Sequence, residues 1–294
     1  MTGTHVERRM DRSADPRPQL FTLAYEILGS TAAADAIVTG AGDGLVDGDR
    51  LALTTLVARA ALDSLRSRLC ACEDYTGPWL PEPLLLDDPD PARDPILAES
   101  ISTAMLLVLE SLEPVDRAVY VLADVFGVAD AEIATIVCSA EAEVRETARR
   151  VRAHVAACRP CFEPVDSARA EAFVDEFLSV AESGNVDDLM ALLTPDAVLT
   201  ADSDGKAIAV RRPVHGALEV ARVLSGFARI GAVVDDYRAD ASMFNSQPGI
   251  TVHYEGRLQS ALTLRLDGGL IDHVYAMRNP EKLTVADRPH AVAR

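Results

Sequence analysis

Residues 112–155 have the pattern of a helix-turn-helix unit, and this pattern limits the architectures open to the chain. Three apolar stretches with helical spacing are broken at Gly127 and at Cys138–Ser139, the usual positions of turns in such a unit. Ser139 is a natural N-cap for the third stretch. The apolar face of that stretch consists of Val144, Ala148, Val151 and Val155. We therefore predict that the third stretch is the recognition helix.

The charge of the predicted recognition helix opposes DNA binding. Its first two exposed turns hold Glu141, Glu143 and Glu146 against Arg145 alone, and residues 99–158 contain ten acidic residues and five arginines. DNA affinity depends mainly on neutralising phosphates. The shape of the unit thus indicates a DNA reader, whereas its charge argues against DNA binding.

The composition indicates a helix-rich, acidic protein with real hydrophobic cores. The 294 residues are enough for two or three domains, 49% of them are hydrophobic and only 5% are aromatic, so Ala, Val and Leu must fill the cores. The formal net charge of −18 disfavours contact with nucleic acid or anionic membranes, with solubility as the alternative explanation. No transmembrane-length apolar run and no signal peptide is found, which predicts a cytoplasmic protein.

The five cysteines do not predict a disulfide framework, because the number is odd and the context is intracellular. Cys70 with Cys72 and Cys158 with Cys161 could together hold zinc in principle. The C-x-C spacing is atypical and there is no second C-x-x-C, so free thiols are the default and no metal is predicted.

Changes in composition and periodicity divide the chain into six segments. Within the first helical segment, residues 31–50 are predicted to be mostly loop after a short helical start, because four glycines disfavour a helix there. The segments are a flexible tail (1–17), a helical domain (18–70), a Pro- and Asp-rich linker (71–95), the helix-turn-helix domain (96–160), an α+β domain (165–285) and a tail (286–294).

Residues 79–84 of the linker, WLPEPL, form a stiff apolar segment that we expect to dock on another part of the molecule. Packing against a neighbouring helix and contact with the α+β domain are both open.

The α+β domain is predicted to be a cone that encloses a pocket. Three helices come first, and alternating segments over 250–256, 260–269 and 270–278 then predict a curved antiparallel sheet. The turn at Asp267–Gly269 is a hairpin signal.

Several motifs occur together in one order along the chain. They are LAYEILGS, LTTLVARAALDSLRS, YTGPWLPEPLL, LESLEPVDRAVYVLADVFG, RRVRAHV, Asp202–Lys206, Arg211–Pro213 and Asn279–Leu283. From residue 20 to residue 283 the chain resembles extracytoplasmic-function sigma factors of the subgroup with a C-terminal SnoaL-like (nuclear-transport-factor-2-like) domain. The resemblance implies a multidomain fold: two all-α sigma-like domains, regions 2 and 4, the second with the helix-turn-helix, precede an α+β SnoaL-like cone. It also implies RNA polymerase core and promoter DNA as partners, with Arg145, Arg149, Arg150 and Arg152 facing the DNA.

The sequence departs from this family in region 2 as well as in the acidic recognition helix. Family members have an acidic and aromatic helix after LGS that grips the polymerase, followed by aromatic residues that capture a promoter base. Residues 31–52 hold neither aromatics nor an unbroken helical pattern, and only the surroundings of Asp35 match the family. Because single-strand capture relies on stacking, this departure predicts that transcription activity has been lost.

We expect acid/base chemistry in the pocket of the SnoaL-like domain, where titratable groups would converge on an apolar cavity. The candidate catalytic residues are Asp204, His215, His253, Asp272 and Tyr275, and the candidate ligand-binding residues are Trp79, Asp202, Lys206, Arg212 and His273. His215 is expected to open a helix, and His253 and His273 to meet on adjacent strands. The alternatives are structural histidines and a simple turn at 202–206. No phosphate loop, G-x-S-x-G or H-E-x-x-H motif is found, and no cofactor is predicted.

Three functions remain open from the sequence. The favoured one is a repurposed sigma scaffold that binds a small apolar metabolite and transforms it by cyclisation, isomerisation or hydrolysis, as in secondary metabolism. The second is a working sigma factor regulated by its SnoaL-like domain. The third is a non-catalytic ligand-sensing regulator.

Overall fold

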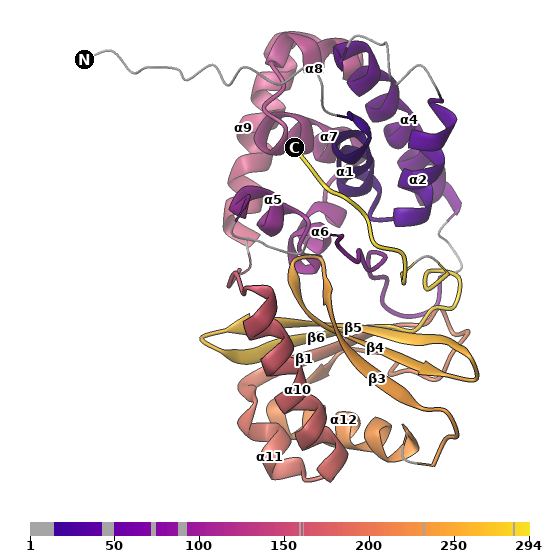
Figure 1. The fold of residues 1–294 in the computed structure, drawn as a ribbon. Coiled ribbons are helices and arrows are strands. Elements are labelled where there is room, and N and C mark those ends of the chain that lie inside the picture. The colour runs from indigo at the N-terminus through magenta and orange to yellow at the C-terminus, as the bar shows by residue number, and fades with distance from the viewer. Residues whose placement is uncertain are drawn as a thin grey trace.

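The computed structural model describes residues 15–42, 50–71, 75–87, 93–158, 160, 162–231, 233–284 and 286–294. Helices of the N-terminal half form one layer, a twisted sheet forms the next, and three further helices cover the other face of the sheet (Figure 1). No helix among the described residues is long and apolar enough to span a lipid bilayer.

The first helices follow the capping signals of the sequence. They are α1 (Arg17–Leu28), α2 (Thr31–Gly40) and α4 (Arg50–Ala71). Helix α1 ends at Gly29, whose φ of 67° is a left-handed conformation that glycine adopts without strain. Ser30 caps α2 by accepting a hydrogen bond from the Ala33 amide. Helix α2 is longer than the short start predicted, because the first glycine of the stretch comes only at its end; residues 43–49 lie outside the described residues.

The helix-turn-helix is confirmed. The helices of this part are α5 (Pro95–Ser100), α6 (Thr103–Glu110), α7 (Pro114–Tyr120), the π-helical turn η2 (Val121–Val125), α8 (Asp130–Val137) and α9 (Glu141–Cys158). Cys138 ends α8 in a left-handed conformation, and the four predicted apolar residues of α9 are all buried.

A single hydrophobic core joins the helices of residues 17–71 to those of residues 95–158. Polar contacts strengthen the junction: the Arg59 Nε of α4 donates to the Ile136 carbonyl at 3.1 Å, and the Arg117 Nε of α7 donates to the Glu26 carbonyl at 2.9 Å. The two sigma-like halves therefore pack against each other as one helical half.

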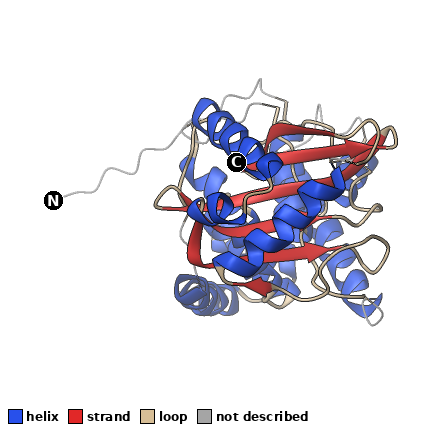
Figure 2. Ribbon diagram, turned by 90° about the horizontal axis from the view of Figure 1, so that it is seen from below, coloured by secondary structure: helices blue, strands red, loops and turns tan. Residues whose placement is uncertain are grey.

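The C-terminal half is an α+β cone. Its elements are α10 (Ser167–Ser183), α11 (Val186–Ala191), β1 (Leu193–Asp202), β2 (Val214–His215), α12 (Ala217–Gly231), β3 (Arg238–Phe244), β4 (Gln247–Tyr254), β5 (Arg257–Asp267) and β6 (Leu270–Met277). The strand order is β2-β1-β6-β5-β4-β3. All neighbours pair antiparallel except β1 and β6, which are parallel, so the sheet is mixed rather than purely antiparallel. Figure 2 shows helices crossing one face of this sheet.

Residues 286–294 run back from the sheet along the helical half (Figure 1). The His290 Nε2 lies 3.0 Å from the Asp35 Oδ2, and the imidazole stacks on Phe21 with ring centroids 4.5 Å apart. At the end of the chain, the Arg294 Nε donates to the Asp94 carboxylate at 2.7 Å. The C-terminal segment thus ties the sheet half to helices α1 and α2.

Candidate functional site

The linker between the two sigma-like halves meets the sheet at the buried carboxylate of Asp202. This carboxylate ends β1, is fully buried, and accepts hydrogen bonds from the Tyr75 hydroxyl at 2.5 Å and the Leu80 amide at 2.8 Å. It also pairs with the Lys282 Nζ at 2.7 Å. We call Tyr75, Leu80, Asp202 and Lys282 the linker junction.

The chain's single tryptophan, Trp79, lies over the linker junction. The Lys282 Nζ is 4.2 Å from the centre of its ring, and the Arg68 guanidinium carbon is 4.4 Å from it. Burial lowers the pKa of Lys282, and the charge of Asp202 opposes that shift. Two cations against one indole make favourable cation–π contacts, so Trp79 binds the linker to both the sheet half and α4.

The turn at residues 203–206 makes a second contact with the linker. Asp204 has a left-handed φ of 47°, and its Oδ1 accepts from the Thr76 amide at 2.9 Å. Lys206 bridges the carboxylates of Asp204, at 2.8 Å, and Glu281, at 2.7 Å. The hydrogen bonds from Lys206 and from the Thr76 amide lower the pKa of Asp204. The motif is therefore both a turn and a linker contact.

The opposite side of the linker is fixed to the first helices by Glu82. Its amide donates to the Gly29 carbonyl at 2.8 Å, and its carboxylate accepts from the Ser30 and Thr31 hydroxyls, both at 2.8 Å, and from the Ala32 amide at 3.0 Å. A carboxylate at a helix N-terminus satisfies amides that have no partner within the helix. Glu82 thus extends the N-cap of α2.

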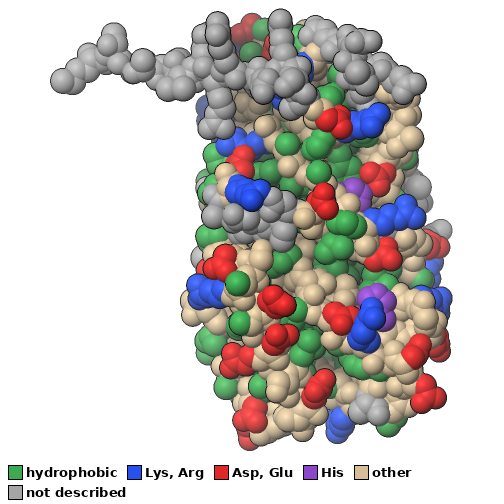
Figure 3. Space-filling view, viewed as in Figure 1, with side chains coloured by type: hydrophobic (Ala, Val, Ile, Leu, Met, Phe, Trp, Pro, Cys, Tyr) green, Lys and Arg blue, Asp and Glu red, His purple; other side chains and the backbone are tan. Residues whose placement is uncertain are grey.

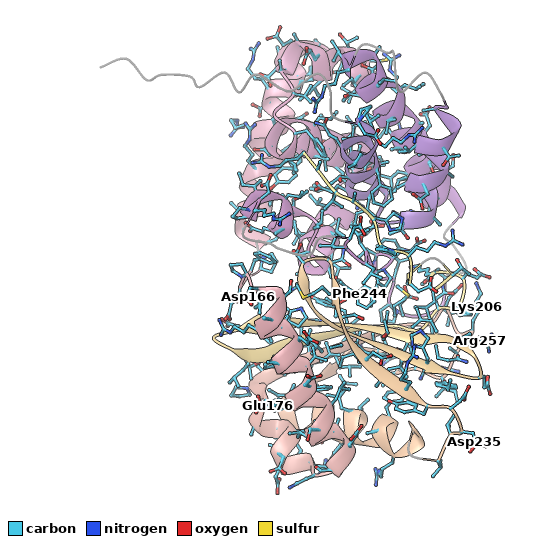
Figure 4. All side chains as sticks on the ribbon, in the orientation of Figure 1. Asp166, Glu176, Lys206, Asp235, Phe244 and Arg257 are labelled. Atoms are coloured by element: carbon cyan, nitrogen blue, oxygen red, sulfur yellow. The ribbon has the colours of Figure 1, made fainter. Side chains whose placement is uncertain are left out.

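The tip of the β3–β4 hairpin inserts between the linker and the helices. Asn245, 1% exposed, exchanges hydrogen bonds with the Leu84 backbone, and its Nδ2 donates to the Tyr25 hydroxyl at 2.7 Å and the Ile101 carbonyl at 2.8 Å. Phe244 beside it points toward the helical half (Figure 4). Our sequence reasoning missed this contact; the one available signal was an Asn-Ser pair between two strand-like segments.

A cavity of about 400 Å³ lies on the other face of the sheet, under α10 and α12. Its wall is mainly apolar, with Phe177, Leu224, Phe227, Ile250, Leu262 and Ala276 among the lining residues. Polar groups gather where β1, β6 and β4 end and β5 begins: Lys206, Tyr254, Gln259 and Arg278. Figure 4 shows Lys206 at this end of the sheet, with Arg257 nearby.

Of the ten candidate catalytic and ligand-binding residues, Lys206 alone lines this cavity. Trp79, Asp202 and Asp204 belong to the linker contacts. Arg212 is exposed in the β1–β2 loop, and His215 is exposed at the end of β2, two residues before α12, rather than in a helix.

Three further candidates, Asp272, His273 and Tyr275, lie on the face of the sheet that is turned away from the cavity, where they contact neighbouring side chains. His273 and Tyr275 stack with ring centroids 4.0 Å apart, and the His273 Nε2 lies 2.9 Å from the Thr200 hydroxyl. Burial lowers the pKa of His273 to about 3 and raises that of Tyr275 to about 12. Asp272 pairs with Arg265, whose Nε donates to it at 2.7 Å.

The expectation that His253 and His273 meet on adjacent strands was wrong. Strand β5 lies between β4 and β6, because consecutive hairpins join β4 to β5 and β5 to β6. On β4 the cavity is lined by Ile250, Val252 and Tyr254, so strand alternation turns His253 to the other face.

The arginines expected to face DNA are all paired with acidic residues. The pairs are Arg145 with Glu141 and Asp130, Arg149 with Glu146, Arg150 with Asp116 and Arg152 with Asp124. Figure 3 shows acidic and basic side chains intermixed, with no basic patch on the described part of the face in view.

No group of three metal-binding side chains occurs among the described residues. Cys138 and Cys158 are free and exposed. Cys72 and Cys161, which the zinc hypothesis needs, lie outside the described residues, as does the side chain of Cys70.

Comparison with known proteins places this architecture in a family. No family model matches the chain. The ECF RNA polymerase sigma factor SigJ of Mycobacterium tuberculosis is 36% identical over 221 residues, which are 72% of this chain and 71% of the relative. The probable ECF RNA polymerase sigma factor SigI of the same species is 24% identical over 282 residues, 91% of this chain and 92% of the relative.

The crystal structure of Mycobacterium tuberculosis SigJ has the same fold over nearly the whole length. It aligns with a TM-score of 0.69 at 31% identity and covers 91% of this chain and 95% of that chain. The helical half, the linker and the α+β cone are thus found together in a relative. The chain belongs to the extracytoplasmic-function sigma factor family, in the subgroup that carries a C-terminal SnoaL-like domain.

Proposed function

We propose that this protein is a cytoplasmic, promoter-reading RNA polymerase sigma factor whose activity is set by its own SnoaL-like domain through the linker. In this proposal residues 18–70 bind the polymerase core and residues 96–160 read promoter DNA. The observation that carries the proposal is the double anchoring of residues 75–87. Asp202 and Asn245 hold them to the sheet, and Glu82 holds them to α2.

The C-terminal segment supports the same proposal. Asp35, the position at which region 2 matches its family, is bonded to His290, which also stacks on Phe21. A cavity of about 590 Å³ between α1, α2 and residues 289–291 is lined by these same three side chains. A polymerase that used this surface would have to displace the C-terminal segment, so the SnoaL-like half is placed to restrain binding.

The relatives named as RNA polymerase sigma factors favour this proposal over a scaffold that has lost transcription. The paired arginines of α9 do not contradict it, because exposed ion pairs contribute only about 0–1 kcal/mol each and can open when phosphates approach. Co-purification with RNA polymerase core tests the proposal: the full chain is expected to bind the core, and absence of binding by folded protein would contradict it.

Turnover of a small apolar metabolite by acid/base chemistry is a second candidate function, and the cavity of about 400 Å³ favours it. None of the five candidate catalytic residues lines that cavity, so proton transfer there would fall to Tyr254 or Glu255. Mass spectrometry of candidate metabolites incubated with the protein tests it. Loss of substrate that Glu255→Gln or Tyr254→Phe abolishes is the expected result, and no loss with any metabolite would count against turnover.

A further inference from the structure

The charged side chains among the described residues that line the cavity under α10 and α12 gather at one end of it. Strands β1 and β6 run parallel and end together, and β5 begins beside the end of β6, so residues 206, 254, 259 and 278 meet at one edge of the sheet. The remaining wall is built mainly from apolar side chains of the sheet and of α10 and α12. A ligand that fits this wall has a long apolar body and one polar end.

Among the described residues that line the polar end, Arg278 is the cation for which no ion pair with a carboxylate is found. Its Nη2 donates to the Tyr254 hydroxyl at 3.0 Å, and its guanidinium carbon lies 5.4 Å from the centre of the Phe227 ring. The Nε is buried without an acceptor, and no carboxylate of the described residues pairs with the side chain. A guanidinium left this way beside an apolar cavity is stabilised by an incoming anion.

Carboxylates around the polar end of the cavity favour an anion that carries a single negative charge. Lys206 is already held by Asp204 and Glu281. Glu255, at the rim, has a side chain that is 68% exposed and lies 3.7 Å from Arg257. These three carboxylates repel a polyanion, whereas one carboxylate can bind the planar fork of Arg278.

We infer that the cavity binds an apolar monocarboxylate, with its carboxylate on Arg278 and its hydrocarbon body between the sheet and helices α10 and α12. The volume of about 400 Å³ lies within the range of small-molecule sites, about 300–1,000 Å³. Binding of the monocarboxylate to this cavity does not depend on the proposed sigma-factor function.

The regulatory consequence of binding rests on the proposed function. The Arg278 amide donates to the Asp202 carbonyl at 2.7 Å, and the Asp202 side chain holds Tyr75 and Leu80 of the linker. Lys206 lines the cavity, and its partner Asp204 accepts from the Thr76 amide. The side chain that binds the carboxylate of the ligand, Arg278, is therefore bonded through its amide to Asp202, the residue that holds the linker.

Calorimetric titration of the full chain with decanoate and with decanol tests the inference, because the probes differ in their polar end. We expect decanoate to bind about tenfold more tightly than decanol, the scale of one charge-assisted contact. Arg278→Gln is expected to remove this preference and to leave decanol binding unchanged. Arg257→Gln, an exposed arginine close to the rim, is the matched control and should keep the preference.

A second substitution keeps the test decisive if Arg278→Gln fails to fold. Arg278→Lys retains the charge and should still favour decanoate over decanol. Equal affinity for the two probes, no binding of either one, or a preference that survives Arg278→Gln would overturn the inference. Polymerase binding by the same proteins without added decanoate is measured separately, so failure of the proposed function and failure of the ligand site are distinguishable.

Discussion

Asp202 and Lys282 form an ion pair of 2.7 Å in which the carboxylate is fully buried and the ammonium side chain is only 11% exposed. They come from the end of β1 and from the segment after β6, and between them they hold the Tyr75 hydroxyl and both backbone groups of Leu80. The pair is therefore the point at which the sheet holds the linker.

Asp202→Asn should destabilise the protein strongly. Removing one partner of a buried pair leaves the other charge uncompensated, at a cost of about 3 kcal/mol. Denaturant unfolding measures the loss, and the emission of Trp79, 4.2 Å from the Lys282 Nζ, should shift in the folded variant. Asp196→Asn, an exposed residue of the same strand, is the control. If both variants unfolded at the same denaturant concentration as the wild type, the linker junction would not stabilise the fold.

Glu82→Gln should loosen the start of α2. The substitution removes the charge that accepts from the Thr31 hydroxyl and the Ala32 amide, and loss of such a cap costs about 1–2 kcal/mol. Amide hydrogen exchange at Ala32 should become faster, whereas Glu171→Gln on the exposed side of α10 should leave it unchanged. Unaltered exchange in Glu82→Gln would show that the linker does not support α2.

Glu26 should make the protein less stable as the pH rises. Burial raises the pKa of this carboxyl to about 8, although the Ser100 hydroxyl and the charges of Arg117 and Arg294 oppose the shift. The folded state then holds a proton that the unfolded state releases above about pH 4.5.

The stabilisation from this proton is complete below pH 4.5 and is lost between that value and about pH 8, at up to about 1.4 kcal/mol per pH unit. Glu26→Gln imitates the protonated form and should flatten the dependence over this range. Equal slopes for the variant and the wild type in denaturant unfolding at several pH values would refute the assignment.

Reversing the acidic residues of α9 should increase the affinity of the protein for DNA. In the variant with Glu141, Glu143 and Glu146 changed to Lys, Arg145 and Arg149 lose their partners on the helix and the added lysines can neutralise phosphates. Binding to duplex DNA should then fall steeply as salt increases. The same three-residue reversal at Glu171, Asp175 and Glu176 on α10 controls for net charge; equal DNA affinity of the two variants would mean that α9 does not face DNA.

Local signals in the sequence were enough to predict the helix-turn-helix, since Gly127 and Cys138–Ser139 break a clear helical period. The linker segment was also correctly expected to dock, because a stiff apolar stretch between polar residues needs a surface to cover it. The cavity residues were not predictable in this way. The face of each strand that lines the cavity depends on how the sheet packs, and a shift of one residue exchanges His253 for Tyr254.

Contacts between residues far apart in the chain could not be predicted from the sequence either. Asn245 is 161 residues from Leu84, and no local pattern relates the two. The pairing of His290 with Asp35 likewise depends on the path of the C-terminal segment along α1 and α2.

In vitro transcription with RNA polymerase core, on genomic DNA fragments and with transcript starts sequenced, tests the central claim most directly. The wild type should give promoter-specific transcripts at a restrained level. Tyr75→Phe and Asp204→Asn, which weaken the sheet side of the linker without removing the Asp202–Lys282 pair, should raise that level several-fold over the Asp196→Asn control. No promoter-specific transcript from any folded variant, or the same level from all of them, would contradict a sigma factor restrained through its linker.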